Sequence, residues 1–293
     1  MEGRRKRGVH GLAAALAAVT LLLTTGASSG AAVNSPLETP EEPLLMKRAA
    51  ELPVLKKTAG GGVVLAAREK ATPEGAGEPE ELPCPVPETA AVEDTYFDKA
   101  VFLGDSRTEG LFLYSGLKTG HFYTAVGATV ESVFSKNAWE TEEGEKIPLL
   151  DAFQDLSCDK VYIMLGVNEL GWSKTKTFHD QYAKLIDRVR EDHPEAKIAL
   201  QSLPPVSAKQ EAKKSYVNNE RIATYNEIIK ALAEEKQCYF LDVASCLTGE
   251  GGVLPVKQTT DGIHFNVAGC KTWLNYLRYH SLEADAIAAA EKG

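Results

Sequence analysis

Residues 100–107 read Ala100-Val101-Phe102-Leu103-Gly104-Asp105-Ser106-Arg107. The apolar first half of this stretch is typical of a buried β-strand, and the glycine and polar residues that follow mark the end of that strand and the start of a helix. Four more apolar runs of this kind lie further along the chain. The candidate strands span residues 100–104, 121–126, 160–165, 198–203 and 239–243. Near-continuous apolar strands of this kind are typical of a mostly parallel sheet that helices cover on both faces.

Helical patterns separate these strands. Apolar residues recur at a spacing of three or four, which places them on one face of a helix. Three such stripes consist of Phe178, Tyr182, Leu185, Ile186 and Val189, then Ile222, Tyr225, Ile229 and Leu232, and finally Val267, Cys270, Leu274 and Leu277. The alternation predicts an α/β fold with three layers, α/β/α, around a mostly parallel five-stranded sheet.

The N-terminus has the layout of a secretory signal. A basic start at residues 4–7 precedes an apolar run over 11–23 and small residues over 24–32. The apolar run is shorter than the about 17–25 residues that a membrane-spanning helix needs. We therefore expect residues 1–32 to be a signal peptide or an uncleaved N-terminal anchor, rather than a buried core helix, and the protein to be secreted or extracytoplasmic.

A change of composition then marks the domain boundaries. Residues 33–95 are rich in Glu and hold nine of the 14 prolines, which predicts a disordered linker, with a short apolar exception at 63–67. This linker either holds the following domain away from a cell envelope or is dispensable. We expect one folded domain over residues 96–283 and a C-terminal tail over 284–293.

Charge and cysteine content limit the possible partners. The chain has 293 residues and a net charge of −9, so it has no general attraction to nucleic acid. The five cysteines show no metal-ligand spacing, and we expect no metal site. Cys84 falls in the linker. The other four, Cys158, Cys238, Cys246 and Cys270, are expected to be small apolar residues in the core or near the surface, and a Cys246–Cys270 bridge stays open.

Polar residues follow several of the candidate strands. The segments are Gly104-Asp105-Ser106-Arg107, Gly127, Gly166-Val167-Asn168-Glu169 and, before the last helix, Asp261-Gly262-Ile263-His264. Reactive groups of open parallel sheets gather beyond the carboxyl ends of the strands. We therefore expect these segments to meet at one edge.

Each of these segments has two interpretations when it is taken alone. Ser106 is either the N-cap of a helix that begins at 107 or 108, or an exposed nucleophile, with Asp105 holding the corner. Asp261 precedes His264 at a spacing that lets the carboxylate orient the imidazole, and Gly262 adds no bulk between them. Asn168 and Gly127 are either turn residues or donors to an oxyanion.

Taken together, the four segments resemble the blocks of the SGNH, or GDSL-type, esterase and lipase family. The resemblance covers residues 101–279 and extends to Tyr225-Asn226, Leu241-Asp242-Val243, Gly269 and Trp273. It implies a flavodoxin-like SGNH-hydrolase fold and a carboxylic ester hydrolase. Two positions depart from the family pattern: Arg107 stands where the name-giving motif has Leu, and Glu169 where Asp is more frequent.

The resemblance implies a role for each matched residue. Ser106 would be the nucleophile, His264 its general base and Asp261 the group that orients the histidine. The backbone N–H groups of Ser106 and Gly127 and the side chain of Asn168 would form the oxyanion hole. Neither a metal nor an organic cofactor is expected.

Export, the acidic domain and the linker suggest an ester on a cell-envelope or environmental glycan. The family that the chain resembles includes carbohydrate acetylesterases, and the resemblance therefore implies a small-molecule or saccharide ester with a short acyl group, chiefly acetyl. Arg107 is expected to contact a polar ring and Trp172 to stack on it, unless they are a solvated arginine and a packed aromatic. The loop 204–219, which is rich in Lys, covers one side of the cleft or is solvated. A glycan-binding envelope protein without activity and a lysophospholipase or thioesterase are the alternatives.

Overall fold

The computed structural model describes residues 56–57, 63–64 and 82–283. Its central feature is a five-stranded sheet in which every neighbouring pair is parallel, in the order β4-β3-β7-β8-β9. The strands are β3 (Ala100–Gly104), β4 (His121–Thr124), β7 (Lys160–Met164), β8 (Lys197–Gln201) and β9 (Tyr239–Leu241). This order is the flavodoxin-like one, so the predicted fold is confirmed. Four of the strands end one or two residues before the predicted position.

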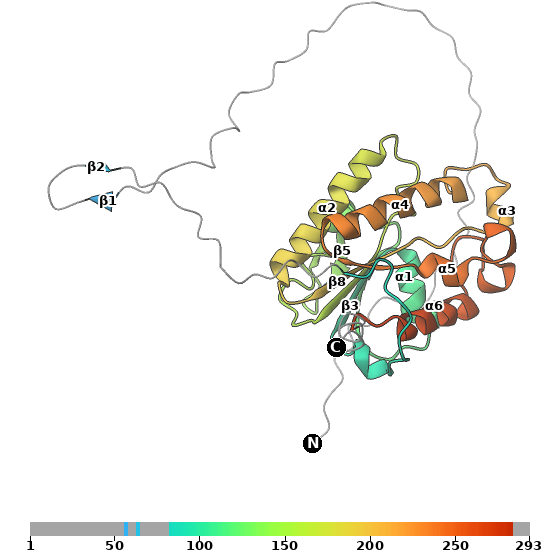
Figure 1. Cartoon of the computed structure of the whole chain (residues 1–293), viewed down its shortest axis with the longest axis horizontal. Helices are drawn as coiled ribbons and strands as arrows, with labels where there is room; N and C mark the ends of the chain where they lie inside the picture. The colour runs from blue at the N-terminus through green and yellow to red at the C-terminus, as the bar shows by residue number, and fades with distance from the viewer. Residues whose placement is uncertain (1–55, 58–62, 65–81, 284–293) are drawn as a thin grey trace, which may run out of the picture. The chain divides into compact units, whose positions relative to one another are not determined.

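Helices cover both faces of this sheet. On one face α2 packs against α4, and on the other α6 packs against α1 and α5, as Figure 1 shows. The helices are α1 (Ser106–Tyr114), α2 (Thr175–Asp192), α3 (Ala208–Glu211), α4 (Asn219–Glu235), α5 (Val243–Leu247) and α6 (Val267–Tyr279). Four short 3₁₀ helices are η1 (Asp94–Phe97), η2 (Ser132–Phe134), η3 (Glu250–Gly252) and η4 (Val256–Gln258).

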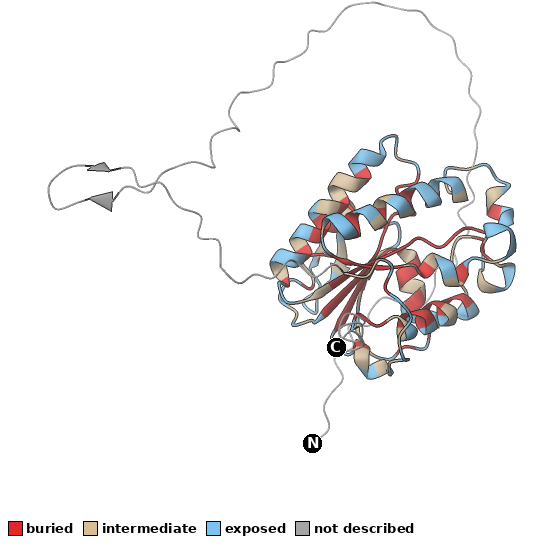
Figure 2. Ribbon diagram, viewed as in Figure 1, coloured by how far each residue is buried: buried red, intermediate tan, exposed pale blue. Residues whose placement is uncertain are grey.

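The predicted apolar stripes form the core, with one exception. Every predicted stripe residue of α2 and α4 is buried, and in Figure 2 the buried strands run between partly buried helices. In α6, Cys270, Leu274 and Leu277 are buried, but Val267 is 49% exposed. The inward position predicted for Val267 is therefore wrong. Val267 follows the N-cap Asn266 directly, and the first position of this helix faces solvent.

Two small antiparallel pairs lie outside the main sheet. One is the hairpin of β5 (Asn137–Glu140) and β6 (Lys146–Pro148). The other joins β1 (Lys56–Lys57) to β2 (Val63–Val64), at the start of the apolar run predicted over 63–67. This second pair belongs to a separate unit, Val9–Pro79. The predicted signal peptide, most of the linker and the C-terminal tail lie outside the described residues.

The folded unit begins earlier than the predicted boundary at residue 96. Val86 is buried, and its N–H donates to the carbonyl of Phe240 over 2.8 Å. The N–H groups of Thr89 and Val92 donate to carbonyls at the end of α6 and just within it, over 2.6 and 2.9 Å. Residues 82–95 thus form an ordered arm, and the prediction of disorder is wrong for them. Their backbone pairs with elements that lie about 150 to 190 positions further along the chain, which composition does not reveal.

Two further observations bear on the sequence predictions. All five cysteines, including Cys246 and Cys270, are free thiols, and Cys84 packs against the domain rather than lying in a linker. Among the described residues, no helix combines the length and the apolar character that a membrane crossing requires.

Candidate active site

The site lies at the carboxyl ends of β3 and β7. These two strands are neighbours in the sheet. After β3 the chain continues to β4 on one side of the pair, and after β7 it continues to β8 on the other side. The crevice at such a switch point is where open α/β sheets bind their ligands. Ser106 follows β3 and Asn168 follows β7, so the topology brings two of the predicted segments to one place.

Asp105, rather than Ser106, caps helix α1. Its carboxylate is fully buried, and Oδ1 accepts the N–H of Arg107 over 2.8 Å. The helix therefore begins at Ser106, one residue before the predicted start, and the capping role considered for Ser106 is wrong. Burial raises the pKa of Asp105 to about 6, although the charge and the N–H of Arg107 oppose this rise. With the cap supplied by its neighbour, the Ser106 hydroxyl is available for another partner.

That partner is His264. The Ser106 Oγ lies 2.9 Å from Nε2 of the imidazole, across 158 positions of the chain. On the other side of the ring, Nδ1 lies 2.7 Å from Oδ2 of Asp261. If Nδ1 carries the ring proton, the hydroxyl donates to Nε2 and the imidazole donates to the carboxylate. The three predicted side chains thus form one continuous hydrogen-bonded relay.

Backbone contacts hold Asp261 in this relay. Its Oδ1 accepts the N–H groups of Ile263 and His264 over 2.9 and 2.8 Å. Partial burial alone would raise the pKa of Asp261, but the hydrogen bonds from the His264 side chain and from these N–H groups outweigh it, and the pKa lies well below its ordinary value. Asp261 is therefore a fixed anion at neutral pH, suited to orient and stabilise an imidazolium.

Gly262 shapes the turn between Asp261 and His264. Its φ is +95°, and a Cβ atom at this position would lie 2.4 Å from the Ser207 Oγ. The carbonyl of Gly262 also accepts the N–H of Ser207 over 2.9 Å. The turn is thus packed against the segment after β8. The sequence suggested that Gly262 leaves room between Asp261 and His264, but the side chain that an added Cβ would meet is Ser207.

Asn168 lies beside Asp105 and contacts Ala128, the residue that follows Gly127. The Asn168 Nδ2 donates to the carbonyl of Ala128 over 2.9 Å and contacts Oδ2 of Asp105 at 3.4 Å. Gly127, the residue before Ala128, is exposed and has a φ of +74°. One hydrogen of the Asn168 amide is taken by Ala128, and the long contact to Asp105 uses the other only weakly. Of the two contacts, the one to Asp105 is the weaker and the more easily exchanged for another acceptor.

Arg107 is not a surface residue. It is 1% exposed, its Nη1 donates to the carbonyl of Pro204 over 3.0 Å, and its guanidinium lies 5.3 Å from the ring centroid of Phe265. The predicted contact with a substrate ring is therefore wrong, and so is the solvated alternative. Burial lowers the pKa of Arg107 to about 10, while the carboxylates of Asp105 and Asp261 oppose the change, so the group stays charged at neutral pH.

The other side of the site is formed by the loop after β7 and the loop 204–219. Trp172 is partly buried against the core, and its predicted stacking on a substrate stays a prediction. Tyr216 is 55% exposed and lies over Gly171, where a Cβ would be 3.2 Å from its ring. Through Tyr216 and Ser207 the loop 204–219 contacts both the Asn168 loop and the His264 turn. It borders the site, as one of the two predictions for this loop proposed.

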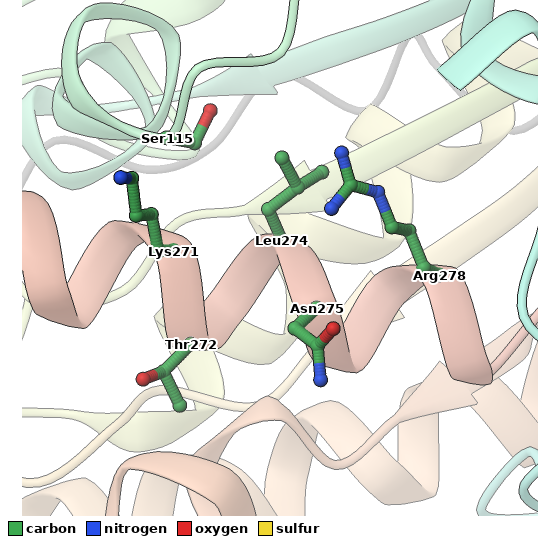
Figure 3. Close-up of a pocket in the computed structure, with 6 residues that line it drawn as sticks. All are labelled: Ser115, Lys271, Thr272, Leu274, Asn275 and Arg278. Atoms are coloured by element: carbon green, nitrogen blue, oxygen red, sulfur yellow. The ribbon is translucent and has the colours of Figure 1, made fainter. Parts of the chain in front are cut away.

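Other places in the domain are distinct from this site. Figure 3 shows a cavity of about 480 Å³ at the end of α1 and beside α6, lined by Ser115, Lys271, Thr272, Leu274, Asn275 and Arg278. None of the predicted site residues lines it. Within the described part of the chain, no group of three or more His, Cys, Asp or Glu side chains is placed to hold a metal ion.

Comparison with known proteins assigns the family. Residues 102–271 match the model of the GDSL-like Lipase/Acylhydrolase family. A search of curated proteins finds no match.

Among solved structures, a Streptococcus pneumonia protein provisionally described as a platelet activating factor is 25% identical with a TM-score of 0.52, over 61% of this chain and 81% of that one. A provisionally assigned GDSL-like lipase from Parabacteroides merdae is 18% identical with a TM-score of 0.50, over 69% and 99%. A GDSL-like lipase from Bacteroides thetaiotaomicron is 20% identical with a TM-score of 0.47, over 69% and 92%. The family match covers more than half of the chain, and the chain therefore belongs to the GDSL-like lipase/acylhydrolase family of ester hydrolases.

Proposed function

We propose that this protein is an exported serine esterase that removes short acyl groups, chiefly acetyl, from a carbohydrate. The observation that carries the proposal is the relay from Ser106 Oγ through His264 to Asp261, with contacts of 2.9 and 2.7 Å. A hydroxyl, an imidazole and a carboxylate in this sequence are the groups that acyl transfer through a serine requires.

The reaction starts with attack by Ser106 on the ester carbonyl. His264 Nε2 takes the hydroxyl proton as the Oγ–C bond forms, and Asp261 stabilises the imidazolium. The carbonyl oxygen becomes an oxyanion, which the N–H groups of Ser106 and Gly127 and the Asn168 amide stabilise. The imidazolium then gives its proton to the leaving alkoxide, and the alcohol departs from an acyl-serine.

Water completes the cycle. His264 takes a proton from the water that attacks the acyl-serine, and a second tetrahedral intermediate forms in the same oxyanion hole. When this intermediate collapses, the Ser106 oxygen leaves and recovers its proton from the imidazolium. The products are a carboxylic acid and the free enzyme, and the steps balance without a metal or an organic cofactor.

The exposure of the site supports a short acyl group on a polar alcohol. The side chain of His264 is 43% exposed and that of Asp261 is 52% exposed. A long acyl chain gains its affinity from an enclosed apolar cavity that buries most of its surface. An open site beside polar loops suits a small acyl group on a hydrated saccharide better. The signal-like segment at residues 1–32 supports export to where such polymers occur.

Acetate release from a panel of acetylated glycans tests this function, with Ser106→Ala as the matched inactive variant. We expect release by the wild type and none above background by the variant. A parallel series of nitrophenyl esters tests chain length, and preference for octanoyl over acetyl would favour a lipase or thioesterase instead. Glycan binding without hydrolysis, and without labelling of Ser106 by a fluorophosphonate, would favour a binding protein.

A further inference from the structure

Glu169 is a buried acid that the acyl-transfer steps leave unused. It follows Asn168 directly, in the loop after β7, and its side chain is completely buried. Oε1 accepts the N–H of Val130 over 2.7 Å, and the Glu169 carbonyl accepts the hydroxyl of Tyr225 over 2.6 Å. Oε2 has no hydrogen-bond partner among the described residues. Burying a carboxyl group costs free energy, so a group in this position is expected to have a role that compensates for the cost.

The Glu169 carboxyl group contacts Val130, which lies shortly after the turn that contains Gly127. Residues 125–128 form a turn that is closed by the N–H of Ala128 on the carbonyl of Ala125, over 3.0 Å, and Gly127 is inside it. The Asn168 amide holds this turn at the Ala128 carbonyl, and Glu169 holds the chain two residues later at Val130. Two consecutive residues of one loop thus hold the segment that carries the proposed oxyanion donor Gly127.

We propose that Glu169 is a positioning residue for acyl transfer, whose carboxyl group fixes the segment 125–130 against the Asn168 loop and so sets the spacing of the oxyanion donors. The inference rests on the proposed function, because it gives Gly127 and Asn168 the oxyanion role. A shift of about 1 Å in a group that stabilises charge is enough to cost on the order of 100-fold in rate.

The surroundings of Glu169 keep its carboxyl group uncharged at neutral pH. Burial raises the pKa of Glu169 to about 8, and the nearby carboxylate of Asp105 acts in the same direction, while hydrogen bonding to the backbone of Val130, Asn168 and Glu169 itself lowers it. The other titratable groups that face it are the hydroxyls of Tyr182 on α2 and Tyr225 on α4. Above pH 8 the group ionises, and a buried charge without a cation in contact disturbs the segment that it holds.

Two substitutions separate the hydrogen bond from the charge. Glu169→Gln keeps an acceptor for the Val130 N–H and cannot ionise, whereas Glu169→Leu fills a similar volume without an acceptor. With p-nitrophenyl acetate at pH 7, we expect Glu169→Gln to stay within about 3-fold of the wild type. We expect Glu169→Leu to lower kcat about 10- to 100-fold with little change in KM, since the oxyanion develops after binding. Above pH 8, kcat of the wild type should fall and that of Glu169→Gln should not.

Ser202→Ala is the matched control for a lost buried acceptor. The Ser202 Oγ accepts the N–H of Ala244 over 2.8 Å and donates to Oδ1 of Asp242 over 2.9 Å, so its hydrogen bonds join β8 to the residues that follow β9 rather than to the oxyanion donors. The variant Ser202→Ala should lower the melting temperature, as Glu169→Leu does, and its kcat should stay near that of the wild type. If Glu169→Leu keeps the kcat of the wild type, or if Glu169→Gln loses as much as Glu169→Leu, the positioning role is wrong.

A measurement without turnover separates this inference from the proposed function. Hydrogen–deuterium exchange of the peptide containing residues 125–132 should be slow in the wild type and in Glu169→Gln, and at least 10-fold faster in Glu169→Leu. Absence of esterase activity in the wild type would contradict the proposed function even if this exchange pattern holds. Equal exchange in all three proteins would contradict the role of Glu169 even in an active enzyme.

Discussion

Asp105 and Ser106 divide two tasks at the corner between β3 and α1. The buried carboxylate of Asp105 accepts the N–H of Arg107, and the Ser106 hydroxyl contacts His264. Serine is a good N-cap, and had it capped the helix, its oxygen would have pointed back at the backbone. Because Asp105 supplies the cap, the nucleophilic oxygen is free while it remains at the end of a helix whose N–H groups favour negative charge.

Asn168 provides the most direct test of the oxyanion hole at this scale. Replacing it with Ala should lower kcat about 100- to 1000-fold, as loss of one such donor does in other serine hydrolases. Asn226→Ala is the matched control, because the Asn226 amide, like that of Asn168, donates to a backbone carbonyl, here that of Leu203 over 2.9 Å, and it also accepts the N–H of Leu203 over 2.7 Å. The control should lose stability and keep most of its kcat. A fall in kcat of less than about 10-fold for Asn168→Ala would remove Asn168 from the oxyanion hole.

Arg107 is a residue whose surroundings could not be predicted from its position in the sequence. Its position beside the nucleophile suggested a substrate contact, yet its guanidinium is enclosed by Pro204 and Phe265. Those neighbours lie 97 and 158 positions further along the chain, so only the fold brings them to Arg107. Glu169 was identified as a departure from the family pattern, but its burial and its contact with Val130 depend on packing in the same way.

At the scale of elements, periodicity predicted most of the fold. The inner strands β3 and β7 are buried on both faces and read as unbroken apolar runs, whereas the edge strand β4 is buried only at Tyr123. The stripes of α2 and α4 are buried as the 3.6-residue period requires. Element ends were less predictable, as Val267 at the start of α6 shows. A first-turn position satisfies the helical period, but whether it faces the core depends on the angle at which the helix begins.

The turn before α6 can be tested with a pair of glycines. Gly262 and Gly251 both have positive φ, +95° and +73°, but an added Cβ meets Ser207 only at Gly262, with nothing within 4 Å at Gly251. Alanine at either position should cost about 1–3 kcal/mol of stability through backbone strain. Only Gly262→Ala should also lower kcat, by at least about 10-fold, because the Asp261–His264 turn must move. Kinetics and thermal unfolding of both variants check this, and equal kcat values would show that the turn is not rigidly placed.

At the scale of the whole chain, the ordered arm of residues 82–95 changes where the catalytic unit begins. Composition indicated a linker because prolines and glutamates dominate this part of the sequence. One buried side chain, Val86, backbone contacts to β9 and to the end of α6, and the ion pair of Asp94 with Arg278 hold it against the domain. Such long-range contacts leave no period and no motif in the sequence.

Truncation measures the contribution of this arm. A chain that begins at residue 82 should keep the melting temperature of the full-length domain and its kcat. A chain that begins at residue 96 loses the burial of Val86, about 1.5–3 kcal/mol, and with it the backbone contacts of the arm, so it should unfold several degrees lower. Thermal unfolding of both chains is the measurement. Equal melting temperatures would show that the arm adds nothing to stability.

The proposed reaction passes through an acylated Ser106, and this acyl-enzyme can be trapped. The protein is mixed with p-nitrophenyl acetate and quenched in acid within the first turnover. It is then digested, and the masses of its peptides are measured by mass spectrometry. We predict one added acetyl group on the peptide that contains Ser106, absent from Ser106→Ala and greatly reduced in His264→Ala. Hydrolysis by the wild type without that acetyl group, or with the acetyl group on another residue, would contradict the account.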